Sequence, residues 1–130
     1  MNDLQKNVIT LVKSALTGEK YELCGDLDIA LVAQTAKKHQ IQALIYYGAL
    51  NCGVSSALPE MQELFVMTCG FISVSAQQMH ELEEIFKQFD EKKVEYMPLK
   101  GTVLKALYPK SEMRTMSDAD ILIKTEQYDL

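Results

Sequence analysis

The sequence predicts an α+β fold, in which a helical N-terminal module leads into the first strands of a sheet. Apolar residues recur with the period of an α-helix from the N-terminus to about residue 90. Short apolar runs follow at residues 94–99 and 121–123, and a further helical pattern lies between them. Short apolar runs bounded by turn residues are typical of strands. The predicted order is four helices, a strand, a helix, a strand and a final helix opening at Thr125.

The first part of the chain contains three amphipathic patterns. Residues 3–16 place their apolar side chains on one helical face, and Gly18 is expected to end this helix. Either Asp26 or Asp28 can cap a second helix that ends near residue 38. The third helix is expected over residues 41–50.

The longest predicted helix begins at Pro59 and continues to about residue 90. Proline suits the first turn of a helix, where its missing N–H group is not needed. The expected buried stripe recurs at helical spacing and is expected to pack against the first three helices: Met61, Leu64, Phe65, Thr68, Phe71, Ile72, Ser75, Met79, Leu82, Ile85, Phe86 and Phe89.

A candidate phosphate site lies where the first predicted strand turns into the next helix. Lys100, Gly101 and Thr102 form this turn, and the apolar face of the helix is expected to consist of Val103, Leu104, Leu107 and Tyr108. Glycine lets a phosphate approach the backbone, and the first N–H groups of a helix favour an anion. Thr102 adds a hydroxyl group and Lys100 a cation. Plainer alternatives stay open: Gly101 opens the helix at a position that needs positive φ, and Lys100 is a solvated lysine.

A candidate metal site follows at Asp118 and Asp120. Residues two apart in a strand point to the same face, so the two carboxylates are expected side by side. Like charges at this spacing repel, and a hard cation such as Mg²⁺ relieves the repulsion. The alternative is that both aspartates cap or solvate a strand edge. Arg114 could hold the two carboxylates in place or bind a nucleotide phosphate.

These residues resemble a known signature. The order Gly101-Thr102, helix, Asp118-Ala119-Asp120 is similar to that of the polymerase-β-like nucleotidyltransferase superfamily, although Thr102 stands where glycine or serine is usual. Residues 94–123 resemble more closely a branch of uncharacterised nucleotidyltransferases within it. The resemblance implies the first strands of a mixed nucleotidyltransferase-like sheet.

The resemblance also implies a function. The full-length protein would transfer a nucleoside monophosphate from an NTP to an unknown acceptor, which could be a small molecule, a protein or RNA. Asp118 and Asp120 would be the catalytic residues and would hold Mg²⁺ (or Mn²⁺). Lys100, Gly101, Thr102 and Arg114 would bind the nucleotide.

Two segments are expected: a helical module over residues 1–92 and the start of a nucleotidyltransferase-like core over residues 93–130. Because the sequence stops within the first turns of the helix expected at Thr125, we expect it to be a truncated piece of a longer protein. A third carboxylate would then lie beyond residue 130, and this piece alone would be inactive. The alternative is a non-catalytic module that binds a nucleotide or a protein on a degenerate nucleotidyltransferase scaffold.

Composition and charge argue against several other classes of protein. A net charge of −5 argues against a sequence-independent nucleic-acid binder, which needs a basic surface. The three scattered cysteines show no disulfide framework or zinc spacing. The sequence shows no signal-peptide core and no apolar run long enough for a bilayer, so a cytoplasmic protein without membrane contact is expected. Self-association of the truncated piece is expected if a strand edge is left unpaired.

Overall fold

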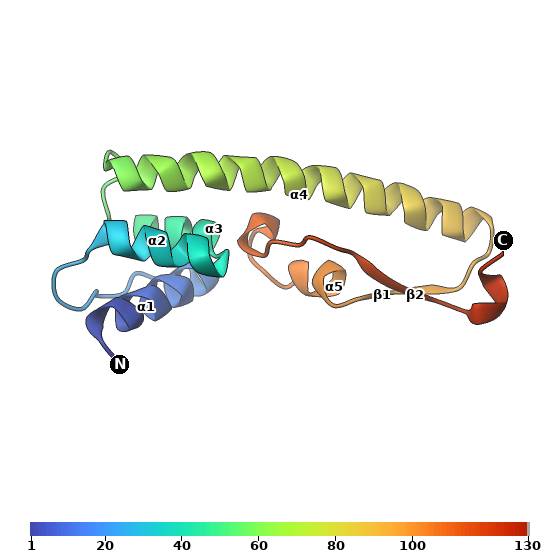
Figure 1. Ribbon diagram of the computed structural model, residues 1–130, viewed down its shortest axis with the longest axis horizontal. Coiled ribbons are helices and arrows are strands. Elements are labelled where there is room, and N and C mark those ends of the chain that lie inside the picture. Colours follow the sequence, from blue (N-terminus) through green and yellow to red (C-terminus); the bar gives the residue numbers. More distant parts are fainter. Residues whose placement is uncertain (130) are drawn as a thin grey trace. The chain divides into compact units, whose positions relative to one another are not determined.

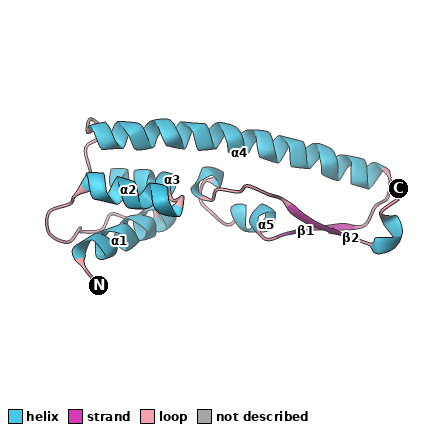
Figure 2. Cartoon of the chain, viewed as in Figure 1, coloured by secondary structure: helices cyan, strands magenta, loops and turns pink. Residues whose placement is uncertain are grey.

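The structure is a computed structural model that describes residues 1–129 (Figure 1). Its α-helices are α1 (Asp3–Thr17), α2 (Ile29–His39), α3 (Gln42–Asn51), α4 (Pro59–Glu91) and α5 (Gly101–Lys105). Its strands are β1 (Tyr96–Leu99) and β2 (Asp120–Ile123), and short 3₁₀ helices lie at η1 (Ser111–Met113) and η2 (Thr125–Gln127). The α+β class is therefore confirmed, as Figure 2 shows. The helix expected at Thr125 is represented by η2.

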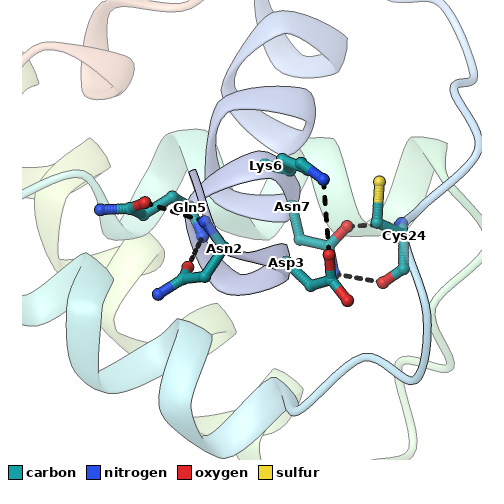
Figure 3. A network of polar contacts seen from close by, with 6 residues as sticks. All are labelled: Asn2, Asp3, Gln5, Lys6, Asn7 and Cys24. Atoms are coloured by element: carbon teal, nitrogen blue, oxygen red, sulfur yellow. Dashed lines mark hydrogen bonds and ion pairs between the residues drawn. The ribbon is translucent and has the colours of Figure 1, made fainter.

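Polar side chains fix both the start of α1 and the loop that follows it (Figure 3). Asn2 and Gln5 form a capping box, in which each side chain accepts a hydrogen bond from the backbone N–H of the other. The Asn7 side chain donates to the Cys24 carbonyl at 2.9 Å and accepts from the Cys24 N–H at 2.7 Å. This double hydrogen bond ties the α1–α2 loop to α1.

The ends of α1 and α2 follow the capping rules that the sequence indicated. Gly18 ends α1 in the left-handed region, with φ of 74°. Asp28, and not Asp26, caps α2, because its carboxylate accepts the Leu31 N–H at 3.0 Å. Gln40 ends α2 in the left-handed region as well, with φ of 56°.

The chain forms two compact units, Met1–Phe71 and Ile72–Leu130, and each is described by itself. The limit between them falls inside α4. The expected boundary between a helical module over residues 1–92 and a nucleotidyltransferase-like core over residues 93–130 stays a prediction. None of the helices within residues 1–129 combines the length and the apolar composition needed to cross a membrane.

The first unit holds a helical core in which α1 packs mainly against α3. Gly48 makes this contact possible, because a Cβ atom on it would lie 1.9 Å from the Leu11 carbonyl oxygen. Met61 and Leu64 of α4 belong to the same core, as predicted, and its buried members are Leu11, Val32, Ala33, Ala36, Ile45, Ala49, Met61 and Leu64.

The second unit holds the sheet. β1 and β2 pair antiparallel, and the register places Tyr96 opposite Ile123 and Leu99 opposite Asp120. Tyr96 stacks on Phe86 of α4 with ring centroids 4.8 Å apart. One antiparallel ladder is described, so the mixed sheet that the resemblance implies stays a prediction.

The expected stripe of α4 is confirmed in part. Met61, Leu64, Thr68, Ser75 and Leu82 are buried. Phe65, Ile72 and Ile85 are exposed, so including them in the stripe was wrong. The buried positions 61, 68, 75 and 82 recur every seven residues, so the buried stripe is regular but narrower than the predicted one.

The predicted apolar face of the helix after the turn was also wrong. Val103, Leu104 and Leu107 are exposed, whereas α5 buries Thr102 and Lys105. Residues three apart share one face of a helix, so the buried face follows Thr102 and Lys105. The aliphatic part of a lysine can take such a place if its ammonium group finds a partner.

Candidate functional site

The end of β1 and the start of β2 bring the phosphate turn and one candidate metal ligand together. Leu99 lies opposite Asp120, so Lys100 follows directly at this end of the ladder. The Lys100 ammonium lies 3.2 Å from the Asp120 Oδ2 atom, and both side chains face solvent. The sequence predicted both residues as site residues, but it did not predict this ion pair.

Lys100, and not Gly101, has the unusual backbone conformation in this turn. Its φ is 44° and its ψ is −115°, a region that residues other than glycine rarely adopt. Gly101 has no positive φ and forms the first residue of α5, so the interpretation of Gly101 as a positive-φ helix opener was wrong.

A glycine is required at position 101 for a different reason, because the Met116 side chain packs closely against its Cα atom. A Cβ atom on Gly101 would lie 3.2 Å from the Met116 sulfur and 3.3 Å from the Met116 Cγ atom. The same Cβ position lies 4.0 Å from Nε of Arg114. Thr102 is buried, and its hydroxyl group lies 3.8 Å from the Met116 sulfur. Residues 114–116 therefore pack directly on the turn.

Arg114 follows η1 and is half-buried. Its Nε atom is buried and has no hydrogen-bond partner among the described residues. Buried polar atoms are nearly always paired, so an unpaired donor beside the Gly101 turn is an unusual feature that calls for an acceptor.

Two residues that the sequence did not indicate hold the segment around Arg114. Lys105 Nζ donates to the Arg114 carbonyl oxygen at 3.1 Å, and Gln78 Nε2 of α4 donates to the Met116 carbonyl oxygen at 2.6 Å. Burial lowers the pKa of the Lys105 ammonium; the nearby Glu112 opposes this shift, and Arg114 adds to it. The apolar pattern around residue 105 did not indicate that Lys105 is buried. Gln78 lies among several polar residues of α4, and their spacing does not distinguish it from the others.

The two aspartates take different places relative to the strand. Asp120 is the first residue of β2, and Asp118 lies two residues before it. The expected alternation holds within β2, where Ile121 and Ile123 are half-buried and Leu122 is exposed. The predicted strand was too long at its start, so its alternation does not by itself bring the two carboxylates together.

The donor chemistry at this position fits a hard divalent cation. Asp118 and Asp120 both expose carboxylates, and Mg²⁺ is commonly bound by one or two carboxylates together with water and substrate phosphates. Within residues 1–129 no group of three or more His, Cys, Asp or Glu side chains could hold a metal ion.

Comparison with known protein families gives a match. A family described as "Uncharacterised nucleotidyltransferase" matches residues 25–130, which include both strands, α5 and every candidate site residue. No curated protein and no solved structure matches the chain. The family is of the general polymerase-β-like kind that the Gly101-Thr102 and Asp118-Ala119-Asp120 motifs indicated. By this match over most of its length, the chain belongs to the family of uncharacterised nucleotidyltransferases.

Proposed function

We propose that this chain carries the metal- and nucleotide-binding part of an enzyme that transfers a nucleoside monophosphate from an NTP to an acceptor. The observation that carries the proposal is that the turn after β1 meets the first residue of β2, with Lys100 Nζ 3.2 Å from Asp120 Oδ2. A cation, a close-approach glycine and a carboxylate thus lie together in a protein of a nucleotidyltransferase family.

Each residue has a distinct role in this proposal. Asp118 and Asp120 hold Mg²⁺ or Mn²⁺ through their carboxylate oxygens. When bound, such an ion neutralises the triphosphate and orients the reacting oxygens. The exposed Lys100 ammonium binds phosphate oxygens, and Gly101, which has no Cβ atom, lets Arg114 lie close to the turn where the phosphates bind. Because the Thr102 hydroxyl faces the Met116 sulfur, Thr102 serves the nucleotide site mainly by shaping this turn.

The partners are an NTP and an acceptor that presents a hydroxyl group. Small molecules, proteins and RNA all carry such groups. Arg114 lies beside Gly101, on the turn where the phosphate chain of the NTP would bind.

Metal binding tests the proposal without knowledge of the acceptor. Water-proton relaxation should show weak binding of Mn²⁺ to the wild type and tighter binding with ATP present, because phosphate oxygens complete the coordination. The Asp118→Asn/Asp120→Asn variant should lose both signals. Asp26→Asn, which removes one negative charge from the exposed loop before α2, is the control and should keep them. Equal Mn²⁺ binding by the wild type and the double variant would overturn the metal site.

Transfer is measured separately in the full-length protein, as incorporation of α-³²P label from each common NTP into pools of small-molecule, protein and RNA acceptors. Label in an acceptor that disappears with Asp120→Asn supports the enzyme. Tight binding of ATP without any label transfer supports the alternative, a nucleotide-binding module without turnover.

A further inference from the structure

The segment that carries Arg114 is held from two elements of the second unit. Lys105 of α5 donates to the Arg114 carbonyl oxygen at 3.1 Å, and Gln78 of α4 donates to the Met116 carbonyl oxygen at 2.6 Å. Ser75 of α4 also donates to the Ser111 hydroxyl group at 3.1 Å, at the start of η1. These hydrogen bonds fix the backbone on both sides of the Arg114 side chain.

Lys105 is the least expected member of this set. Its relative exposure is 3%, although lysine is rarely buried unless its charge is paired. Its ammonium group is used by a backbone carbonyl and is withdrawn from solvent, so Lys105 is unsuited to contact a ligand directly. A buried charge costs free energy, which the nearby Glu112 and the hydrogen bond to the Arg114 carbonyl offset here.

What it holds is the only arginine of the sequence. Arg114 Nε is buried without a partner among the described residues, and it lies 4.0 Å from the position of a Cβ atom on Gly101. Asp120 already has a cationic partner in Lys100. Arg114 is therefore not needed to neutralise Asp120. Its guanidinium lies at the turn, where its planar donors suit phosphate oxygens.

We propose that Lys105 and Gln78 are positioning residues, which hold Arg114 beside Gly101 so that its guanidinium binds the phosphate chain of the nucleotide. This inference rests on the proposed function. It assigns Arg114 to the phosphates and leaves Asp118 and Asp120 to the metal. Neither Lys105 nor Gln78 touches the ligand in this proposal.

Titration calorimetry with inorganic triphosphate and Mg²⁺ tests the proposal, since this probe carries the phosphate chain without a base. Lys105→Met keeps the apolar stem and should weaken triphosphate binding about tenfold, as expected for misplacing one charge-assisted contact. Lys87→Met removes the same charge from the exposed face of α4 and should leave the affinity unchanged.

A double-mutant cycle separates positioning from simple charge loss. If Lys105 acts through Arg114, Lys105→Met should have no further effect in an Arg114→Gln background. Equal weakening in both backgrounds would overturn the proposal, because Lys105 would then act on the ligand independently of Arg114. Gln78→Met is measured alone and in the Arg114→Gln background in the same way. It replaces Lys105→Met in the cycle if Lys105→Met does not fold.

The remaining outcomes separate this inference from the proposed function. If Arg114→Gln leaves the affinity unchanged while the wild type binds triphosphate, the inference fails and the metal and nucleotide proposal stands. If the wild type does not bind triphosphate, both fail.

Because Arg114 is the only arginine, its Nε–H group gives a single, self-assigned signal in a ¹H–¹⁵N spectrum. The signal should shift when triphosphate is added to the wild type. In Lys105→Met without ligand it should show faster solvent exchange, whereas Lys87→Met should leave it unchanged. A signal that does not respond to triphosphate would overturn the proposal, whatever the stability of the variants.

Discussion

At the scale of single residues, Lys100 combines a costly backbone conformation with a place at the candidate site. Its φ of 44° and ψ of −115° suit glycine, and such conformations cost a lysine about 1–3 kcal/mol. The neighbouring Gly101 does not need positive φ. The chain therefore keeps a charged side chain where stability alone would favour glycine, which fits a role of the ammonium group in binding.

This conflict predicts opposite effects of one substitution. Lys100→Gly should raise the free energy of unfolding by about 1 kcal/mol, because the relief of strain exceeds the loss of an exposed ion pair. The same variant should bind Mg²⁺–triphosphate more weakly, because one cation is lost. Urea unfolding and titration calorimetry measure the two effects.

Lys124→Gly is the matched control for Lys100→Gly. Lys124 also forms an exposed ion pair, with Glu95 at 2.6 Å, but its backbone is ordinary, with φ of −67° and ψ of 136°. Glycine at this place should lower the free energy of unfolding by up to about 1 kcal/mol, because the unfolded chain gains freedom. If both variants are destabilised to the same extent, Lys100 is not strained.

The burial of Lys105 predicts a pH dependence of stability. Its pKa is lowered by burial, with Glu112 opposing and Arg114 adding to the shift, whereas the unfolded chain has the ordinary value of 10.5. Between the lowered pKa and 10.5 the unfolded state binds more protons, so stability rises with pH in this window. Below the window the cost of burying the charge is fully present.

Lys105→Met has no ammonium group and therefore lacks this contribution. The free energy of unfolding of the wild type should rise relative to that of Lys105→Met as the pH increases toward the ordinary lysine pKa of 10.5. Urea unfolding of both proteins across this range gives the difference. Two parallel pH profiles would show that the Lys105 ammonium has the same pKa in the folded and unfolded states.

At the scale of elements, the α1–α3 contact depends on one glycine. A Cβ atom on Gly48 would lie 1.9 Å from the Leu11 oxygen and 2.6 Å from the Leu11 carbonyl carbon, and the backbone cannot give way as a side chain can. Gly48→Ala should therefore lower the free energy of unfolding by more than about 3 kcal/mol, the upper end for overpacking.

Gly70 is the matched control, because it also lies within a helix but, apart from the nearby backbone of that helix, no described atom lies within 4 Å of its Cβ position. Gly70→Ala should raise the free energy of unfolding by up to about 1 kcal/mol through helix propensity. Thermal and urea unfolding of the two variants measure this contrast. A mild effect of Gly48→Ala would mean that α1 and α3 are further apart than described.

The helices were predictable because their signals are local. Periodicity and end residues such as Asp28, Gly18 and Pro59 act within one or two turns, so the sequence alone indicates four helices close to those observed. The five residues of α5 do not span two full turns, and its buried face depends on residues 111–116, which pack on it. The apolar pattern therefore indicated the wrong face.

For the candidate site, the sequence indicated the residues but not the contacts between them. The residue types and their order indicated Lys100, Gly101, Thr102, Arg114, Asp118 and Asp120, because these types carry the chemistry, and the roles of these residues stay a prediction. The ion pair between Lys100 and Asp120 and the support from Lys105 and Gln78 arise from contacts between residues 9–38 positions apart in the sequence. A single sequence contains no local signal for such pairs.

At the scale of the whole molecule, the described sheet has only two strands, so each strand has one unpaired edge. Pro98 in β1 has no N–H group and makes the β1 edge a poor template for another strand. β2 contains no proline, and its exposed Leu122 lies opposite Met97 in the register. The relative exposures of these two side chains are 54% and 52%, so they form an apolar surface beside the β2 edge.

These features predict self-association through β2. Sedimentation velocity should show a rising sedimentation coefficient as the protein concentration increases, because exposed strand edges with apolar neighbours favour strand pairing. Leu122→Lys should suppress this association, since it places a charge beside the edge. Val66→Lys, at a comparably exposed apolar position on α4, should not suppress it. A wild type that sediments as a monomer at every concentration would show that the β2 edge is protected, and equal suppression by both variants would point to non-specific apolar contact instead of strand pairing.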